Sequence, residues 1–189
     1  MVLPIYLYGH PVLRAVAQPV TPDYPGLADL IQNMKETMYG SDGIGIAAPQ
    51  VGVSLRLVYI DVNVLGDDMP ELKGVHMTLI NPEITVDESV ATTSREEGCL
   101  SLPGIHENVA RHEKIHLKWH DEEWNVHEQD IEGYLARVVQ HECDHLDGTV
   151  FTDRISPIRK QMVRTKLGNI LKGKVHCNYR TKGAKPGRK

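Results

Sequence analysis

The chain has 189 residues, of which 41% are hydrophobic and 24% are charged, and its formal net charge is −4. This length and composition predict one compact domain with a sizeable core. Three cysteines are too few for a disulfide framework, and no apolar run is long enough for a signal peptide or a membrane span. We therefore expect a cytoplasmic protein whose partners include neither a membrane nor DNA.

A first amphipathic helix is predicted between Pro25 and Gly40. Its apolar residues recur at helical spacing, and the glycine is placed to end it. These apolar residues are Leu27, Leu30, Ile31, Met34 and Met38. We expect this helix to contribute to the core.

Residues 43–52 form a glycine-rich segment, Gly-Ile-Gly-Ile-Ala-Ala-Pro-Gln-Val-Gly. Its first six residues match G-x-G-x-x-A, the fingerprint of dinucleotide-binding folds. The context argues against nucleotide binding, because a helix precedes the segment where a strand is required and Pro49 prevents the helix that should follow. We interpret the segment as a wall whose backbone faces a ligand, with Gln50 offering a side-chain amide.

The next part of the chain is predicted to form strands, with a surface loop at residues 63–74. Pro82 confines the second of these strands to an edge or a bulge. The predicted strands span residues 54–62, 77–86, 89–95, 109–120 and 124–129.

One H-E-x-x-H sequence, residues 112–116, falls within the fourth of these strands. There Ile115 and Leu117 alternate with polar residues, a period of two that is typical of a half-buried strand. Histidines four residues apart on a strand are roughly 13 Å apart and cannot share a metal ion. We therefore expect His112 and His116 to lie on a solvated strand face.

A second H-E-x-x-H occurs in residues 140–148, at the end of a predicted helix that begins near Glu132. Four residues turn a helix by about 400°, so the side chains of His141 and His145 project about 40° apart and can share one metal ion. Glu142 lies beside them, where its carboxylate can accept a proton from an attacking water.

Two histidines are too few for a metal site, and Cys99 is the candidate for the third ligand. It follows Gly98 and precedes a Pro-Gly turn, on a bend where the backbone can approach a bound substrate closely. Cys143 is less suitable because it lies about 200° around the helix from His141, and Cys177 lies far along the chain. Two His, one Cys and an open fourth position describe a catalytic rather than a closed structural site.

The last predicted helix starts at Ser156 and Pro157, which are a good cap and a good first position. Its apolar residues are predicted to share one face, and they are Ile158, Met162, Val163, Leu167, Ile170 and Leu171. We predict a single catalytic domain in residues 1–172 and a basic flexible tail in residues 173–189. Strands followed by the site helix indicate an α+β fold, with antiparallel or mixed sheets packed around a central metal-binding helix and a C-terminal helix.

Three segments together resemble the peptide deformylase family, which removes the formyl group from the initiator methionine of new bacterial proteins. The family's pattern is G-x-G-x-A-A-x-Q, then E-G-C-L-S, then Q-H-E-x-D-H-L-x-G. The chain has these motifs in residues 43–50, 97–101 and 140–148, in the same order. The resemblance extends from the start of the chain to about Leu171, and it implies hydrolysis of N-formylmethionyl nascent peptides with release of formate.

The resemblance implies a role for each residue that matches a motif. Cys99, His141 and His145 would bind one divalent metal ion, in this family typically Fe2+, which Zn2+, Ni2+ or Co2+ can replace. Glu142 would accept the proton of the water that attacks the formyl carbon and pass it to the departing amine. The Gln50 side-chain amide and the Leu100 backbone N–H would stabilise the oxyanion.

Further positions are expected to contact the substrate. The backbone of Ile44 and Gly45 would pair with the extended peptide, and an apolar pocket for methionine would involve Ile44, Val138 and Tyr134. We also expect Glu97 and Gly98 to bind the substrate.

Three further residues are assigned supporting roles. An ion pair of Glu97 with Arg111 would either support the site or be a surface pair of little energetic value. Asp144 and Gln140 are expected to support the metal ligands or the fold rather than to act in catalysis.

Charge is segregated along the chain. The last 36 residues contain 12 Lys and Arg and no Asp or Glu, so their formal charge is +12 and that of the first 153 residues is −16. Such a segment is commonly a solvated helix face followed by a loose tail. The family resemblance suggests a sharper alternative, in which this basic segment associates with ribosomal RNA near emerging chains.

Two other functional classes stay open. A zincin-type endopeptidase also uses H-E-x-x-H, but it normally has its third ligand downstream of the helix, whereas Cys99 lies upstream. A structural zinc module would need a fourth ligand, for which His106 or Cys177 is available.

Overall fold

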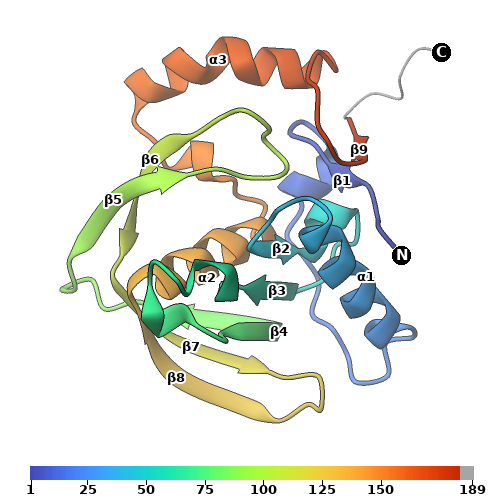
Figure 1. The fold of residues 1–189 in the computed structure, drawn as a ribbon, viewed down its shortest axis with the longest axis vertical. Helices are drawn as coiled ribbons and strands as arrows, with labels where there is room; N and C mark the ends of the chain where they lie inside the picture. Colours follow the sequence, from blue (N-terminus) through green and yellow to red (C-terminus); the bar gives the residue numbers. More distant parts are fainter. Residues whose placement is uncertain (184–189) are drawn as a thin grey trace.

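The structure is a computed structural model that describes residues 1–183, and its fold is α+β (Figure 1). The α-helices are α1 (Leu27–Tyr39), α2 (Gly133–Leu146) and α3 (Pro157–Leu171). The strands are β1 (Ile5–Tyr6), β2 (Gly45–Ala47), β3 (Leu57–Asp61), β4 (His76–Thr85), β5 (Thr92–Glu97), β6 (Glu107–His112), β7 (Lys114–His120), β8 (Val126–Glu132) and β9 (Thr181–Lys182).

Helix α2 runs through the middle of the molecule (Figure 1). Every residue from Ala136 to Leu146 is buried, although the stretch contains both apolar and polar side chains. The apolar stripe packs on a five-stranded sheet, as expected for one face of an amphipathic helix. The polar stripe is buried as well, so each of its charged groups needs a partner inside the protein.

The five-stranded sheet is antiparallel throughout, in the order β2-β3-β4-β7-β8. Strand β3 sends Val58 and Ile60 toward α2 and sends Leu57 and Tyr59 into a second core cluster, because successive side chains point to opposite faces. Pro82 is predicted to lie at an edge or a bulge. Strand β4 lies inside the sheet rather than at its edge, and its register shifts between Ile80 and Glu83, so the bulge is the alternative that the structure confirms.

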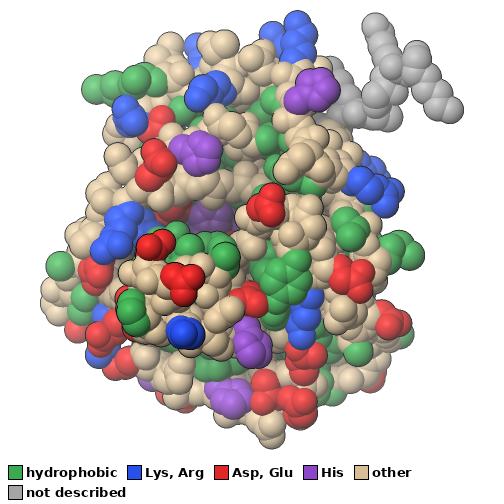
Figure 2. All heavy atoms as spheres, in the orientation of Figure 1, with side chains coloured by type: hydrophobic (Ala, Val, Ile, Leu, Met, Phe, Trp, Pro, Cys, Tyr) green, Lys and Arg blue, Asp and Glu red, His purple; other side chains and the backbone are tan. Residues whose placement is uncertain are grey.

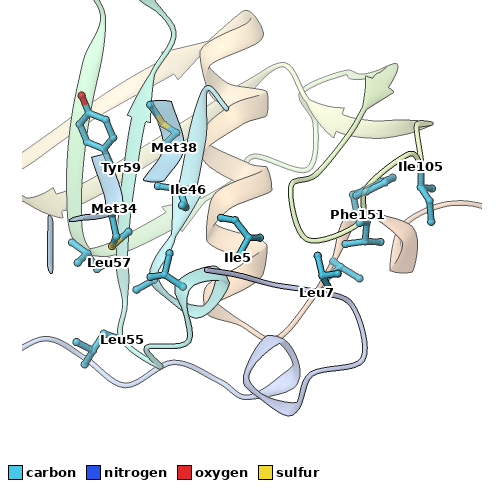
Figure 3. Close-up of a cluster of buried hydrophobic side chains, with 14 of the residues drawn as sticks. Ile5, Leu7, Met34, Met38, Ile46, Leu55, Leu57, Tyr59, Ile105 and Phe151 are labelled. Carbon is cyan, nitrogen blue, oxygen red and sulfur yellow. The ribbon is translucent and has the colours of Figure 1, made fainter. Parts of the chain in front are cut away.

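The second core cluster joins α1, β1 and β3 to the segment that precedes α3 (Figure 3). The apolar face predicted for α1 is confirmed, with Ile31, Met34 and Met38 buried and Leu27 and Leu30 packed beside them. Since the two clusters occupy opposite faces of β3, this end of the sheet is covered by α1 on one side and by α2 on the other.

The prediction of one continuous strand at residues 109–120 is wrong. It is divided at Glu113 into β6, which pairs only with β5, and β7, which belongs to the five-stranded sheet. The period of two continues across the break, since Val109 and Arg111 are buried in β6 and Ile115 is buried in β7. Alternation therefore cannot reveal the change of sheet.

The first H-E-x-x-H sequence spans this break. His112 ends β6, whereas His116 lies in β7, where its ring nitrogens are 2.8 Å from Asp130 and 2.9 Å from Glu128. The two histidines therefore belong to different sheets.

The apolar face predicted for α3 is only partly correct. Val163 and Ile170 are buried and Leu167 packs beside them, whereas Ile158 is 75% exposed and Met162 is 63% exposed. The helix lies at one end of the molecule (Figure 1) and packs on the core through Val163, Leu167 and Ile170, which form a narrow stripe. The other apolar side chains project away from that stripe.

The flexible tail predicted from Gly173 differs from the structure as far as residue 183. Strand β9 pairs in parallel with β1, with a hydrogen bond of 2.8 Å from the Ile5 N–H to the Arg180 carbonyl and one of 2.9 Å from the Leu7 N–H to the Lys182 carbonyl. Residues 181–182 form a strand because the free edge of β1 offers unpaired backbone groups to them. The composition of the segment does not reveal this edge. Residues 184–189 of the predicted tail lie outside the described residues.

No helix within residues 1–183 combines the length and the apolar character needed to cross a membrane.

Candidate metal centre

The metal ligands predicted from the sequence meet at one point. Sγ of Cys99 and one ring nitrogen each of His141 and His145 all lie within 4.8 Å of one another. Sγ is 3.3 Å from His145 Nε2, and the centroids of the two imidazole rings are 5.3 Å apart. The two histidines meet because they lie one turn apart on α2. Among residues 1–183 this is the one such group of three donors.

The donor set fits a divalent transition metal. Burial alone would raise the pKa of the Cys99 thiol, but attraction to His145 and hydrogen bonds with both histidines lower it to about 5. Cysteine binds metals as the thiolate, so this environment favours the ligating form. Within residues 1–183, His145 Nδ1 and Glu142 Oε2 are buried without a hydrogen-bond partner.

Glu142 lies at the floor of the site and is in contact with β2. Burial raises the pKa of its carboxyl to about 7, although attraction to His141 and His145 opposes the shift. A Cβ atom added to Gly45 would lie only 2.5 Å from Glu142 Oε1. The absence of a side chain at Gly45 is therefore what admits the carboxylate to this position.

Glu97 is the centre of a buried network of charges. Arg111 donates two hydrogen bonds of 2.9 Å to its two oxygens, Arg137 donates one of 2.8 Å, and His141 Nδ1 lies 2.9 Å away. Burial alone would raise the pKa of Glu97, but hydrogen bonds from Arg111 and His141 outweigh it and lower the pKa to about 2. The carboxylate thereby orients a predicted metal ligand, as outer partners of ligating histidines commonly do.

The network continues to the far end of α2. The Asp144 carboxylate accepts a hydrogen bond of 2.6 Å from Arg111 and further hydrogen bonds from Arg154. Gln140 bonds through its amide to the N–H and carbonyl of His112 in β6. The structure thus places the Glu97–Arg111 pair in the interior rather than on the surface, with Asp144 and Gln140 in contacts that hold α2 to β6.

Gln50 and the turn after Cys99 form one side of the site. The Ala47 N–H donates to Gln50 Oε1 at 2.8 Å, which leaves the amide nitrogen directed at Cys99 Sγ, 3.5 Å away, and at Ser101 Oγ, 3.4 Å away. No acceptor within residues 1–183 takes the Leu100 N–H. The Gln50 amide nitrogen and the N–H of Leu100, the residue after Cys99, are therefore two candidate donors at the site.

A cavity of about 620 Å³ opens over these residues. All but one of the predicted site residues line it, and they are Ile44, Gly45, Gln50, Glu97, Gly98, Cys99, Leu100, Tyr134, Val138, His141 and Glu142. The exception is His145, which lies beneath it and is 1% exposed.

Sequence reasoning missed several residues of the cavity. Arg137 is one helical turn before His141 on α2, and this spacing predicts that the two side chains lie on the same face of the helix. Residues 176–179 come from the predicted tail, where no sequence signal distinguishes them. The other missed lining residues are Asp42, Gly43, Glu96, Pro103, Gly104 and His106.

The chain is similar to known proteins over nearly its entire length. The family model for polypeptide deformylase matches residues 2–161. A peptide deformylase of Flavobacterium johnsoniae is 43% identical over 197 residues, covering 100% of both chains, and one of Salinibacter ruber is 46% identical over 183 residues, covering 95% of this chain and 93% of the relative. The crystal structure of peptide deformylase from Thermus thermophilus aligns with a TM-score of 0.80 and 40% identity, covering 92% of this chain and 100% of that one.

Glu97→Gln should test the buried network. The substitution keeps the side-chain volume but removes the charge that Arg111 and Arg137 face in the interior. Breaking a buried pair by removing one partner costs about 3–5 kcal/mol, so we expect the free energy of unfolding in urea to fall by about that amount.

The matched control is Lys114→Met. Lys114 lies 2.8 Å from Asp130 in a pair whose two side chains are both exposed, so its loss should change the free energy of unfolding by less than about 1 kcal/mol. Equal effects of the two substitutions would contradict a central role for the buried network.

Proposed function

The chain belongs to the peptide deformylase family, and from this premise we propose how its own residues perform the family's reaction. That reaction is the metal-dependent hydrolytic removal of the formyl group from N-formylmethionine at the N-terminus of newly made proteins, with release of formate. The chain is thus a metal-dependent amide hydrolase. The observation that carries our assignment of the active centre is the convergence of Cys99, His141 and His145, with Glu142 beside them.

We propose that these three residues hold one divalent ion, which is Fe2+ in the cell. Zn2+, Ni2+ and Co2+ are expected to replace it, because a thiolate and two imidazoles suit all four metals. When bound, the ion supplies a Lewis acid that makes water nucleophilic near neutral pH. Glu97 holds His141 in the orientation that leaves its other ring nitrogen for the ion.

Glu142 is proposed as the general base and then the general acid. Its unpartnered oxygen is available to accept a proton from the attacking water, and its raised pKa suits proton exchange near neutral pH. The same carboxyl then delivers the proton to the departing amine of methionine. One group can serve both steps because attack releases the proton that departure consumes.

Gln50 and Leu100 are proposed to stabilise the oxyanion that forms at the formyl oxygen. The Gln50 amide nitrogen is fixed by the bond from Ala47 to its own carbonyl oxygen, so the donor is oriented before substrate arrives. The Leu100 N–H has no acceptor within residues 1–183 and is therefore free to donate. Fixed donors of this kind act on charge that develops in the transition state.

The substrate peptide is proposed to lie along β2. This strand is the edge of the five-stranded sheet. The Ile44 carbonyl already accepts the Asp61 N–H at 2.9 Å, so we propose that an extended chain pairs with the remaining backbone groups of Ile44 and Gly45. The methionine side chain would then enter the part of the cavity lined by Val138 and Tyr134.

The turn that leads to Cys99 completes the substrate site. A Cβ atom at Gly98 would lie 2.8 Å from the His106 ring, so a glycine lets the turn pack closely against His106, and we propose that the substrate contacts the Gly98 backbone. We assign Glu97 to the support of His141 rather than to direct substrate contact, because its oxygens are occupied by Arg111, Arg137 and His141.

We propose that the catalytic unit comprises residues 1–183, because β9 pairs with β1 and residues 176–179 line the cavity. The substrates of the family are nascent chains, so we propose that the protein acts in the cytoplasm, close to the ribosome.

The alternative is a zincin-type endopeptidase, which would share the H-E-x-x-H helix. The decisive experiment is to measure formate release from a formyl-Met-Ala-Ser peptide beside hydrolysis of casein. We expect formate without proteolysis, and the reverse result would contradict the proposed function. A structural zinc site is disfavoured because the donor group within residues 1–183 has three members rather than four.

Substitution of the candidate ligand and of the candidate base should separate metal binding from chemistry. Cys99→Ala removes one of three protein ligands together with its negative charge, so metal content and activity should fall together. Glu142→Ala should retain the metal while turnover falls by about 10²–10⁴-fold, the usual contribution of general acid–base catalysis. Metal content is measured by elemental analysis and turnover by formate release. Full metal occupancy in Cys99→Ala would show that the third ligand is another residue.

Gly45→Ala should impair catalysis through Glu142. The added methyl group would displace the carboxylate, and a misplacement of 1 Å can cost about 10²-fold in rate, so we expect a loss of that order in formate release. Gly168→Ala is the matched control, because a Cβ atom there meets nothing within 4 Å. The proposed geometry fails if both alanine variants turn over like the original protein.

The basic surface of α3 and the segment after it is proposed to associate with ribosomes. Figure 2 shows Lys and Arg side chains over the end of the molecule that carries α3. Charge reversal at Arg164 and Lys172, both exposed, should weaken co-sedimentation with ribosomes in a salt-dependent manner and spare turnover of short peptides.

The control for this experiment reverses Lys73 and Lys118, which are exposed outside α3 and change the net charge equally. Equal sedimentation of the two double variants would show that no localised basic surface is involved.

A further inference from the structure

The segment that follows α3 turns back to the active centre. Gly173 has a φ of +68°, which reverses the chain just after the helix. Strand β9 then lies beside β1 near the N-terminus (Figure 1), and main-chain hydrogen bonds of 2.8 and 2.9 Å from Ile5 and Leu7 fix it there. Between these two points the chain passes the mouth of the cavity, and residues 176–179 line it. This segment lies beyond residue 161, where the match to the family model ends.

Tyr179 connects this segment to the turn that carries Cys99. Its hydroxyl donates a hydrogen bond of 2.8 Å to the Leu100 carbonyl. Its half-buried ring packs against the core cluster shared by α1 and β1. Packing of the ring therefore fixes the position of the hydroxyl, and its hydrogen bond is to the carbonyl of Leu100, which lines the cavity.

The turn is held at two successive carbonyls by the two ends of the chain. Tyr179 binds the carbonyl of Leu100, and the backbone N–H of Tyr8 binds that of Ser101 at 2.8 Å. Within the turn the Leu102 N–H bonds to the Cys99 carbonyl at 2.9 Å. The hydroxyl of Tyr179 is the side-chain group that fixes the peptide plane immediately after Leu100.

We propose that Tyr179 is a positioning residue for deformylation. By holding the Leu100 carbonyl, its hydroxyl fixes the peptide plane that follows the Leu100 Cα, and the Leu102 N–H holds the Cys99 carbonyl of the plane that precedes it. The Leu100 N–H belongs to that preceding plane, and with both planes held it stays directed at the developing oxyanion. A donor of this kind contributes only when its direction is set before the reaction. The inference rests on the proposed function and adds to it a residue outside the three sequence motifs.

The test is Tyr179→Phe, which removes one oxygen atom and keeps the ring in the core. Loss of an entire oxyanion donor costs about 10²–10³-fold in kcat, and a donor that is misdirected rather than lost should cost less, so we expect kcat to fall about 10-fold. KM for a formyl-Met-Ala-Ser peptide, metal content and the urea midpoint of unfolding should stay near those of the original protein. Tyr24→Phe is the control, because Tyr24 packs against the same core cluster but does not line the cavity.

Each other outcome overturns the inference. An unchanged kcat in Tyr179→Phe would show that the hydroxyl does not position the donor. A raised KM with unchanged kcat would assign the hydroxyl to substrate binding, and a loss of metal or a lowered urea midpoint that accounts for the lost rate would assign it to structure. If the original protein itself released no formate, the proposed function would fail, and that result is separate from any result with the variant.

Discussion

The proposed active centre depends on burial of the Glu97 carboxylate between Arg111, Arg137 and His141. Burying a carboxylate away from water raises the free energy of the folded protein unless its oxygens accept hydrogen bonds from charged donors. Here two guanidinium groups and an imidazole bind the Glu97 oxygens, and the pKa of Glu97 falls to about 2 despite burial. The network lets a helix with a polar stripe lie in the interior, and that stripe carries the groups that we propose to react.

The local parts of the site could be predicted from the sequence, because helical spacing alone brings His141 and His145 to one face with Glu142 between them. Cys99 followed from the count of donors that a catalytic metal requires. Burial of the Glu97–Arg111 pair could not be predicted, since nothing in the sequence shows how β5 and β6 cover α2. Predicted and observed positions agree best where the geometry is set within a single turn.

The parts of the fold that could not be predicted depend on contacts between distant segments. Residues 109–120 keep one period of two across Glu113 while changing sheets, so the pattern is the same for one strand as for two. Helix α3 has more apolar residues than it buries, so its apolar pattern alone does not show which of them contact the core. The residues after Gly173 have the composition of a loose tail, yet the free edge of β1 orders them as β9.

The central claim is that one thiolate and two imidazoles of this chain bind the catalytic ion. X-ray absorption spectroscopy at the metal edge of the zinc-loaded protein tests it most directly, since a Zn–S bond of about 2.3 Å is distinct from Zn–N bonds of about 2.0–2.1 Å. The account predicts one sulfur and two imidazole nitrogens around the ion in the original protein, with the sulfur absent in Cys99→Ala. A coordination shell without sulfur, or with two sulfurs, would contradict it.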